Sequence, residues 1–235
     1  MIFRQLFDRD TCTYTYLLGD EETGDAVLID PVLENVERDL QFLKELGLTL
    51  RYVCETHVHA DHVTGAGLLR QKTGCKTCVS RNAGAECADR QVGDGSLVEF
   101  GRYGLEVRET PGHTDGCVTY VLQDHSMAFT GDTLFIRGCG RTDFQQGSAE
   151  RLYRSIHDAI FTLPDECRIY PGHDYKGRTV STVAEEKQFN PRLGGGKSVE
   201  DFAAIMAALD LAPPARLEVS VPANQNCGLS PALAH

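Results

Sequence analysis

The sequence predicts an α/β protein in which two β-sheets are covered by helices. Short segments rich in aliphatic, β-branched and aromatic residues are interrupted by Gly, Pro or Asp, and they are mixed with stretches of helical periodicity. These segments follow no fixed period, so the chain is not built from repeats. No linker rich in Pro or Ser divides the 235 residues, so we expect a single domain over residues 1–235.

The predicted strands are short and end beside turn-forming residues. They cover residues 2–7, 13–18, 26–31, 50–55, 97–100, 105–110, 117–122, 127–130 and 168–170. The third ends in Asp30-Pro31, a dipeptide that favours a turn, and the fourth runs directly into a cluster of histidines.

Helical spacing of apolar residues predicts the helices, over residues 36–46, 68–74, 148–160, 179–188 and from residue 198 onward. Gly47 and Gly74 are typical stops, and Ser148 and Ser198 are typical N-caps. The glycine-rich stretch before Ser198 is not a phosphate-binding loop, because residue 191 is Pro where that loop requires Gly, and no strand precedes it. We interpret this stretch as a turn.

Composition excludes some partners and indicates a compartment. The chain has 23 Lys and Arg against 34 Asp and Glu, a formal net charge of −11, which argues against nucleic acid or an anionic membrane as a partner. No segment resembles a signal peptide, a transit peptide or a membrane span. Nine Cys cannot all pair within one chain, so we expect mostly free thiols in a reducing compartment. The intact Met1 favours a bacterial cytoplasm over a mitochondrial matrix.

Residues 56–62 hold the densest group of chemically reactive side chains. Three imidazoles and one carboxylate, from His57, His59, Asp61 and His62, follow directly after a predicted strand. His57 and His59 are two residues apart, so they can face one point. Neutral imidazole and carboxylate suit zinc or iron, whereas a solvated polar loop has little reason to contain three His. We interpret this cluster as a metal site.

Three later segments share a further design, since each places a His or Asp just after a strand and beside Gly. They are residues 110–114 with His113, 129–133 with Asp132, and 170–174 with His173. Gly lets the backbone turn sharply, so the side chain can point into a common site. One such turn would be a weak signal, but three of them after the histidine cluster indicate one metal centre.

This arrangement resembles the metallo-β-lactamase superfamily. The pattern H-x-H-x-D-H followed by His, Asp and His is matched by His57, His59, Asp61, His62, His113, Asp132 and His173. The resemblance implies an αββα sandwich of four layers, with the metal site at one edge of the two packed sheets. Because the superfamily includes hydrolases and oxygen-dependent enzymes on one scaffold, the fold does not choose the reaction.

Two reaction classes therefore compete. A binuclear hydrolase similar to glyoxalase II would use all seven side chains to hold two metals and activate a bridging water. A mononuclear Fe(II) oxygenase would use two His and one carboxylate and leave positions open for O2 and substrate. A non-enzymatic alternative, a redox sensor based on Cys75 and Cys78, leaves the ligand-type residues unexplained.

Segments beyond these ligands resemble the persulfide dioxygenases, or sulfur dioxygenases, the family of the ethylmalonic encephalopathy protein. They are residues 12–19, 135–147, 173–177, 190–193 and 221–228. The resemblance covers nearly the whole chain. Glyoxalase II is similar only around the ligands and continues into a longer helical tail, for which little room is left after Gly177.

This resemblance implies an enzyme that oxidises glutathione persulfide with O2 and water to sulfite and glutathione, in sulfide and persulfide detoxification. It implies one Fe(II) per subunit, held by His57, His113 and Asp132. The other ligand-type residues, His59, Asp61, His62 and His173, would orient those three through hydrogen bonds. A homodimer, and a rhodanese or sulfide:quinone oxidoreductase that supplies the persulfide, are the protein partners consistent with the family.

Glutathione carries two carboxylates, so a chain of net charge −11 requires local cations to bind it. Arg141 and Arg192 are candidates for bidentate contact with a carboxylate, and a surface ion pair is the alternative for each. Tyr175 can donate a hydrogen bond beside His173. Cys139 either lines the substrate channel or packs as a buried thiol, and we favour packing.

The remaining Cys and His carry weaker signals. Cys75 and Cys78 form a C-x-x-C pair, but no second pair lies at zinc-finger spacing, so we favour packed thiols. We expect His125, His157 and His235 to face solvent.

Overall fold

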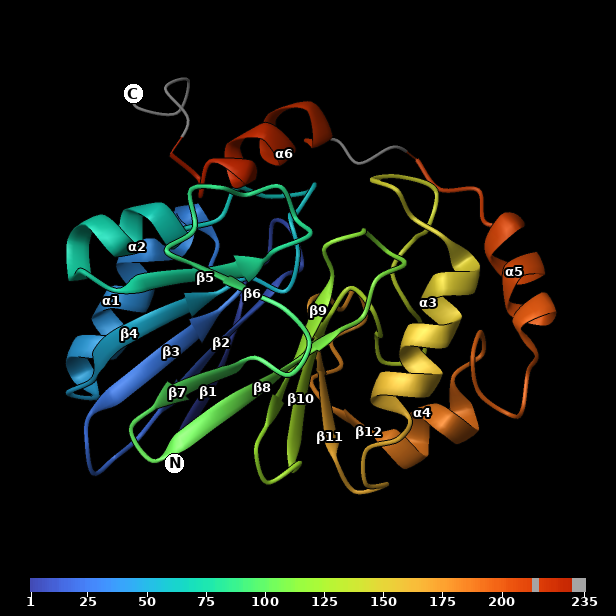
Figure 1. Cartoon of the computed structure of the whole chain (residues 1–235), viewed down its shortest axis with the longest axis horizontal. Coiled ribbons are helices and arrows are strands. Elements are labelled where there is room, and N and C mark those ends of the chain that lie inside the picture. Colours follow the sequence, from blue (N-terminus) through green and yellow to red (C-terminus); the bar gives the residue numbers. More distant parts are fainter. Residues whose placement is uncertain (213–215, 230–235) are drawn as a thin grey trace.

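The computed structural model of the chain describes residues 1–212 and 216–229, which form two six-stranded sheets packed face to face (Figure 1). The first sheet contains, in spatial order, β1 (Ile2–Phe7), β2 (Tyr14–Gly19), β3 (Asp25–Ile29), β4 (Thr49–Cys54), β5 (Lys76–Ser80) and β6 (Arg90–Val92). The second contains β12 (Ser181–Thr182), β11 (Arg168–Pro171), β10 (Met127–Gly131), β9 (Val118–Leu122), β8 (Tyr103–Glu109) and β7 (Leu97–Phe100).

Helices cover the outer face of each sheet. The helices are α1 (Val36–Glu45), α2 (Ala66–Thr73), α3 (Ala149–Ser155), α4 (Val183–Phe189), α5 (Val199–Ala207) and α6 (Leu217–Gln225). A 3-10 turn, η1 (Leu33–Asn35), precedes α1, and a π-helical segment, η2 (Ile156–Ile160), extends α3. Figure 1 shows α1 and α2 outside the first sheet and α3 to α5 outside the second, with α6 at one end of the sandwich. The predicted α/β class and αββα sandwich are confirmed.

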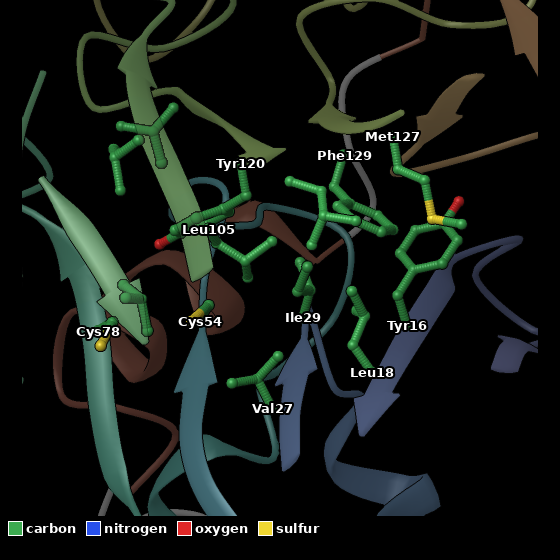
Figure 2. Close-up of a cluster of buried hydrophobic side chains, with 14 of the residues drawn as sticks. Tyr16, Leu18, Val27, Ile29, Cys54, Cys78, Leu105, Tyr120, Met127 and Phe129 are labelled. Atoms are coloured by element: carbon green, nitrogen blue, oxygen red, sulfur yellow. The ribbon is translucent and has the colours of Figure 1, made fainter. Parts of the chain in front are cut away.

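The core lies between the sheets, because strands β2 and β3 alternate their side chains between two apolar layers. Tyr16, Leu18, Val27 and Ile29 face the second sheet, where they meet side chains such as Phe129 (Figure 2). The intervening positions pack beneath α1 and α2 instead. Both faces of these strands are covered, which explains why the sequence shows continuous apolar runs rather than alternation with polar residues.

The predicted strands lie within two residues of observed ones, and the predicted caps are also observed. The Ser148 hydroxyl accepts a hydrogen bond from the backbone N–H of Arg151. Ser198 and Asp201 form a reciprocal capping box at the start of α5. Gly74 ends α2 with φ of 74°, in the left-handed region that favours glycine.

The prediction was wrong in one helix, where it also missed β12, and it missed β5, β6, α6 and the 3-10 turn η1. Residues 179–188 are not all helical, because Ser181 and Thr182 first pair with β11 and Thr182 then caps α4. Strands β5 and β6 were not predicted, β6 being only three residues long. Helix α6 was also missed, since it contains Pro222 and polar residues that obscure helical periodicity.

A disulfide joins Cys87 to Cys227 over a sequence separation of 140 residues. It links the segment between β5 and β6 to the turn after α6, a pairing that the sequence did not predict. The remaining seven are free, and Cys75 and Cys78 are buried thiols with no bond between them, as favoured from the sequence. Among the described residues, no helix has the length and apolar character needed to cross a membrane.

We expect the Cys87→Ser variant to lose about 2–4 kcal/mol of unfolding free energy, because the disulfide restricts a long loop of the unfolded chain. Denaturant unfolding of the wild type and the variant, each with and without a thiol reductant, measures this loss. Reductant should bring the wild type to the stability of the variant and leave the variant unchanged. Equal stability of the oxidised wild type and the variant would contradict a stabilising bond.

Candidate metal centre

The metal-type side chains converge because the strands that carry them end at one edge of the sandwich. His57 follows β4, His113 follows β8, Asp132 follows β10 and His173 follows β11. Glycine is required at three of these ends. A Cβ on Gly112, where φ is 138°, would lie 2.3 Å from the backbone nitrogen of Leu152. Gly131 has φ of 50°, and a Cβ there would lie 2.4 Å from the Thr56 hydroxyl oxygen. A Cβ on Gly172 would lie 2.7 Å from Asp132 Oδ1, so side chains at all three positions are excluded by close approach.

His57, His113 and Asp132 form a group that can hold a metal ion. Asp132 Oδ2 lies 3.6 Å from His113 Nε2 and 4.0 Å from His57 Nε2. Two ligand atoms bound at ordinary lengths of about 2.1 Å to one metal cannot be more than about 4.2 Å apart, so these separations fit a shared ion. The rings of His57 and His113 meet nearly perpendicular, with centroids 5.0 Å apart.

Hydrogen bonds at the far nitrogen set the tautomer of each ring. His113 Nδ1 donates to the carbonyl of Arg141 at 2.7 Å, which leaves the Nε2 lone pair facing Asp132. The Thr56 hydroxyl donates to Asp30 Oδ2 at 2.7 Å, so its oxygen is free to accept from His57 Nδ1 at 3.0 Å. Both imidazoles therefore present an unprotonated Nε2, the form that binds a metal.

The ionisation of this group also suits a metal. Burial lowers the pKa of His57 well below its usual value, and the neighbouring His59 adds to this effect, so His57 is neutral. Burial would raise the pKa of Asp132, but the adjacent His173 outweighs burial and lowers it below its ordinary range. The group therefore combines two imidazoles with an ionised carboxylate.

His173 lies between two aspartates and has both ring nitrogens engaged. Nδ1 is 2.7 Å from Asp132 Oδ1, and Nε2 is 2.9 Å from Asp61 Oδ2 and 3.1 Å from the Thr13 hydroxyl. Burial would lower its pKa, but Asp132 and Asp61 raise it well above the usual value. Since Oδ1 of Asp132 is held by His173, Oδ2 is directed at the two imidazoles.

His59 lies beside His57, with ring centroids 4.1 Å apart, but it faces other partners. Its Nε2 is 3.3 Å from both Asp30 Oδ1 and Glu55 Oε2. Burial would lower the pKa of His59, but these carboxylates raise it to about 10, which makes the ring a buried cation. His62 Nδ1 contacts Asp61 Oδ2 at 3.0 Å, and the set His59, Asp61 and His62 is a second group with metal-binding spacing.

Asn224 of α6 holds the loop that carries these histidines, and sequence reasoning missed it. Its side-chain amide donates to the carbonyls of His59 at 2.9 Å and His62 at 2.8 Å, and its oxygen accepts from the N–H of Thr64 at 2.8 Å. Nothing in the local sequence links residues so far apart along the chain. The likeness of residues 221–228 to the persulfide dioxygenases was the one signal that pointed to this segment.

A cavity of about 500 Å³ opens above His57, His113 and Asp132, and all four predicted substrate contacts line it. The Arg141 guanidinium, however, makes two 2.7 Å hydrogen bonds to Asp143 and a third to the carbonyl of Ala212. The alternative considered for Arg141, an ion pair, is thus what the structure contains. Arg192 has no acidic partner among the described residues, and one of its nitrogens donates to the carbonyl of Cys139 at 2.9 Å.

Tyr175 and Cys139 occupy opposite environments in this cavity. Tyr175 is 69% exposed, and its ring stacks on His173 with a centroid separation of 6.0 Å. Cys139 is buried, its sulfur lies 3.7 Å from that of Met206, and burial raises the pKa of its thiol to about 11. The favoured interpretation of Cys139 as a packed thiol agrees with this environment. Lys176 and Arg178 also line the cavity and were not predicted.

His125 and His157 are half-buried, so their predicted exposure was only partly right. His157 stacks on Tyr153 with ring centroids 3.9 Å apart. His235 lies outside the described residues.

Comparison with known proteins identifies the family to which the chain belongs. Residues 11–173 match the model of the metallo-beta-lactamase superfamily. A Bos taurus protein named persulfide dioxygenase ETHE1, mitochondrial, is 59% identical over 230 residues, which cover 97% of this chain and 89% of the bovine one. The crystal structure of ETHE1 from Myxococcus xanthus has a TM-score of 0.94 at 56% identity and covers 97% of this chain and 100% of its own. The chain belongs to the persulfide dioxygenase family of the metallo-β-lactamase superfamily.

The persulfide dioxygenase resemblance found from sequence motifs is therefore confirmed, and the chain is an enzyme. A hydroxyacylglutathione hydrolase from Rhodopseudomonas palustris is also similar, at 34% identity over 187 residues, but these cover 77% of this chain and 69% of the hydrolase. The likeness to the persulfide dioxygenases is both higher and longer.

We expect Thr56→Val in this persulfide dioxygenase to weaken metal retention by about 10-fold to 100-fold, because the Nδ1 partner of His57 is lost. Competition between the protein and a chelator, followed by metal analysis, measures the change. Thr77→Val is the matched control, since Thr77 is buried and its hydroxyl donates to Asp89 Oδ2 at 3.0 Å without touching a histidine. Equal metal retention in both variants would contradict a role for Thr56 in fixing the ring.

We expect Cys139 to resist iodoacetamide at pH 8 in the native enzyme, because a buried thiol with a pKa of about 11 is scarcely ionised there. Mass spectrometry of digested protein measures labelling at each Cys. The half-buried Cys12 is the internal comparison and should label faster. Fast labelling of native Cys139 would contradict the packed environment.

Proposed function

We propose that this enzyme oxidises glutathione persulfide with O2 and water to sulfite and glutathione, using one Fe(II) held by His57, His113 and Asp132. The bond between the two sulfurs breaks, and the terminal sulfur gains three oxygens, two from O2 and one from water. Four electrons pass from that sulfur to O2, so no further oxidant is required. Two imidazoles and one carboxylate on one side of a metal are typical of non-haem Fe(II) oxygenases.

The observation that carries the proposal is the division of the seven metal-type side chains into two sets. His57, His113 and Asp132 direct free ligand atoms at one point below the cavity. His173 has both nitrogens engaged by aspartates, and His59 is paired with two buried carboxylates. A second ion bound through His173 or through Nε2 of His59 would have to displace these carboxylates, whereas the ion held by His57, His113 and Asp132 displaces none of them.

The bound iron would supply O2 activation, and the residues of the chain would supply geometry and charge. Thr56 and the Arg141 carbonyl hold the two imidazoles in the metal-binding tautomer. His173 keeps a proton on Nδ1, donates it to Asp132 Oδ1, and so orients Oδ2 toward the metal. Arg192 offers N–H groups to a substrate carboxylate at the cavity wall, and Tyr175 covers His173 at the mouth.

After anaerobic purification we expect about one iron and little zinc per chain, with O2 uptake only when glutathione persulfide is present. His113→Ala should lower both iron content and O2 uptake more than about 100-fold, because a direct ligand is lost. An oxygen electrode and metal analysis measure the two effects. His125→Ala is the control, since its half-exposed ring contacts Glu106 and no metal-type residue of this centre.

An enzyme with two zinc ions that consumes no O2 would contradict the proposal. Release of glutathione from an acyl-glutathione thioester would instead indicate the glyoxalase II-like hydrolase. We further propose that the enzyme works as a homodimer supplied with persulfide by a rhodanese or a sulfide:quinone oxidoreductase, which sedimentation and coupled assays test.

A further inference from the structure

The cavity above the metal centre is lined by more cations than carboxylates, although the chain as a whole is anionic. Its cations are Arg137, Arg141, Lys176, Arg178 and Arg192, and its carboxylates are Asp61, Asp132 and Asp174. Asp61 and Asp132 are both engaged by His173. An anionic ligand entering this cavity therefore meets a local field opposite in sign to the net charge of −11.

Two of the five cations are already neutralised. Arg137 pairs with Glu185 and Glu186 of α4, and Arg141 pairs with Asp143. Within residues 1–212 and 216–229, Lys176, Arg178 and Arg192 form no ion pair with a carboxylate. These three are available to a ligand, and two of them lie in one turn.

The turn that carries Lys176 and Arg178 is fixed from beneath. Asp174 is buried, and its Oδ2 accepts the backbone N–H groups of both Lys176 and Arg178 at 2.7 Å. Gly177 has φ of 78°, which permits the tight turn between them. The Arg178 guanidinium is oriented by a 3.0 Å hydrogen bond to the carbonyl of Ile136 at the cavity wall. The two cations are thus held at the mouth by the backbone of their own turn.

This turn suits a carboxylate that has no ammonium group beside it. The γ-glutamyl end of glutathione bears an ammonium next to its carboxylate, and Lys176 and Arg178 would repel it. The glycyl end bears a carboxylate alone. We propose that Lys176 and Arg178 bind the glycyl carboxylate and so select glutathione-type persulfides over persulfides that lack this group. This inference rests on the proposed function.

A comparison of two substrates with two enzymes tests the subsite. The substrates are glutathione persulfide and its glycyl ethyl ester, and the enzymes are the wild type and the double variant Lys176→Gln/Arg178→Gln. We expect the double variant to raise KM for the free acid about 10-fold to 100-fold with little change in kcat, because charged hydrogen bonds in binding are lost. Esterification should raise the KM of the wild type similarly and should not affect the double variant.

The control is Lys44→Gln/Arg154→Gln, which removes the same charge from exposed positions that do not line the cavity. A KM increase in the double variant that is equal for both substrates, or no increase at all, would overturn the subsite.

Calorimetric binding of glutathione and of its glycyl ester separates this inference from the proposed function. If no persulfide supports O2 uptake, the proposed reaction fails, yet tighter binding of glutathione than of its ester, lost only in the double variant, would still support the subsite. Equal binding of the two by the wild type would overturn it.

Discussion

The carboxylate of Asp30 joins the end of β3 to the start of the histidine loop, and the metal centre depends on it. One oxygen accepts the backbone N–H of Thr56 and the other its hydroxyl, each at 2.7 Å. Asp30 itself has φ of 50°, a conformation that costs a non-glycine residue about 1–3 kcal/mol and persists only where its surroundings enforce it. Two hydrogen bonds hold the backbone there. The Thr15 hydroxyl donates to the carbonyl of Asp30, and the N–H of Asp30 donates to the carbonyl of Cys54. The tautomer of His57 therefore depends on a strained residue one strand away.

Pairs of opposite charges constrain the rest of the site in the same way as Asp30 constrains Thr56. His59 is held between Asp30 and Glu55, and His173 between Asp61 and Asp132. A protonated His59 or His173 would be unstable in the interior without its two carboxylates, because an unpaired buried charge is costly. The metal-type side chains therefore form one network. His57, His113 and Asp132 present ligand atoms to one point, His173 is held between two aspartates, and His59 Nδ1 and His62 Nε2 are buried without a hydrogen-bond partner. Asn224 adds a third constraint, since it fixes the backbone carbonyls of the loop itself.

The sequence allowed prediction of the ligand positions and of the strand ends that carry them, because both are local patterns. The H-x-H-x-D-H spacing and the three strand–Gly turns appear without any knowledge of packing. Long-range partners could not be predicted in this way. The contacts of Asn224 and the bond from Cys87 to Cys227 join segments more than a hundred residues apart, and nine Cys permit many pairings. The pairing of Arg141 with Asp143 is an intermediate case. The carboxylate lies only two residues away in the sequence, but the residue type of Arg141 had suggested a contact with the substrate instead.

Net charge and site charge act over different distances, so an anionic chain can present a cationic cavity to the anionic substrate proposed above. Salt at physiological strength screens exposed charges beyond about 8 Å, so most of the 34 acidic residues contribute little inside the cavity. What matters there is which cations keep an internal partner. Arg141 lies at the wall but is committed to Asp143, whereas Arg192 and the turn from Asp174 to Arg178 present donors whose positions the backbone fixes. If the proposed substrate is right, its binding would depend on cations that have no carboxylate partner among the described residues, and the number of arginines near the site would not predict it.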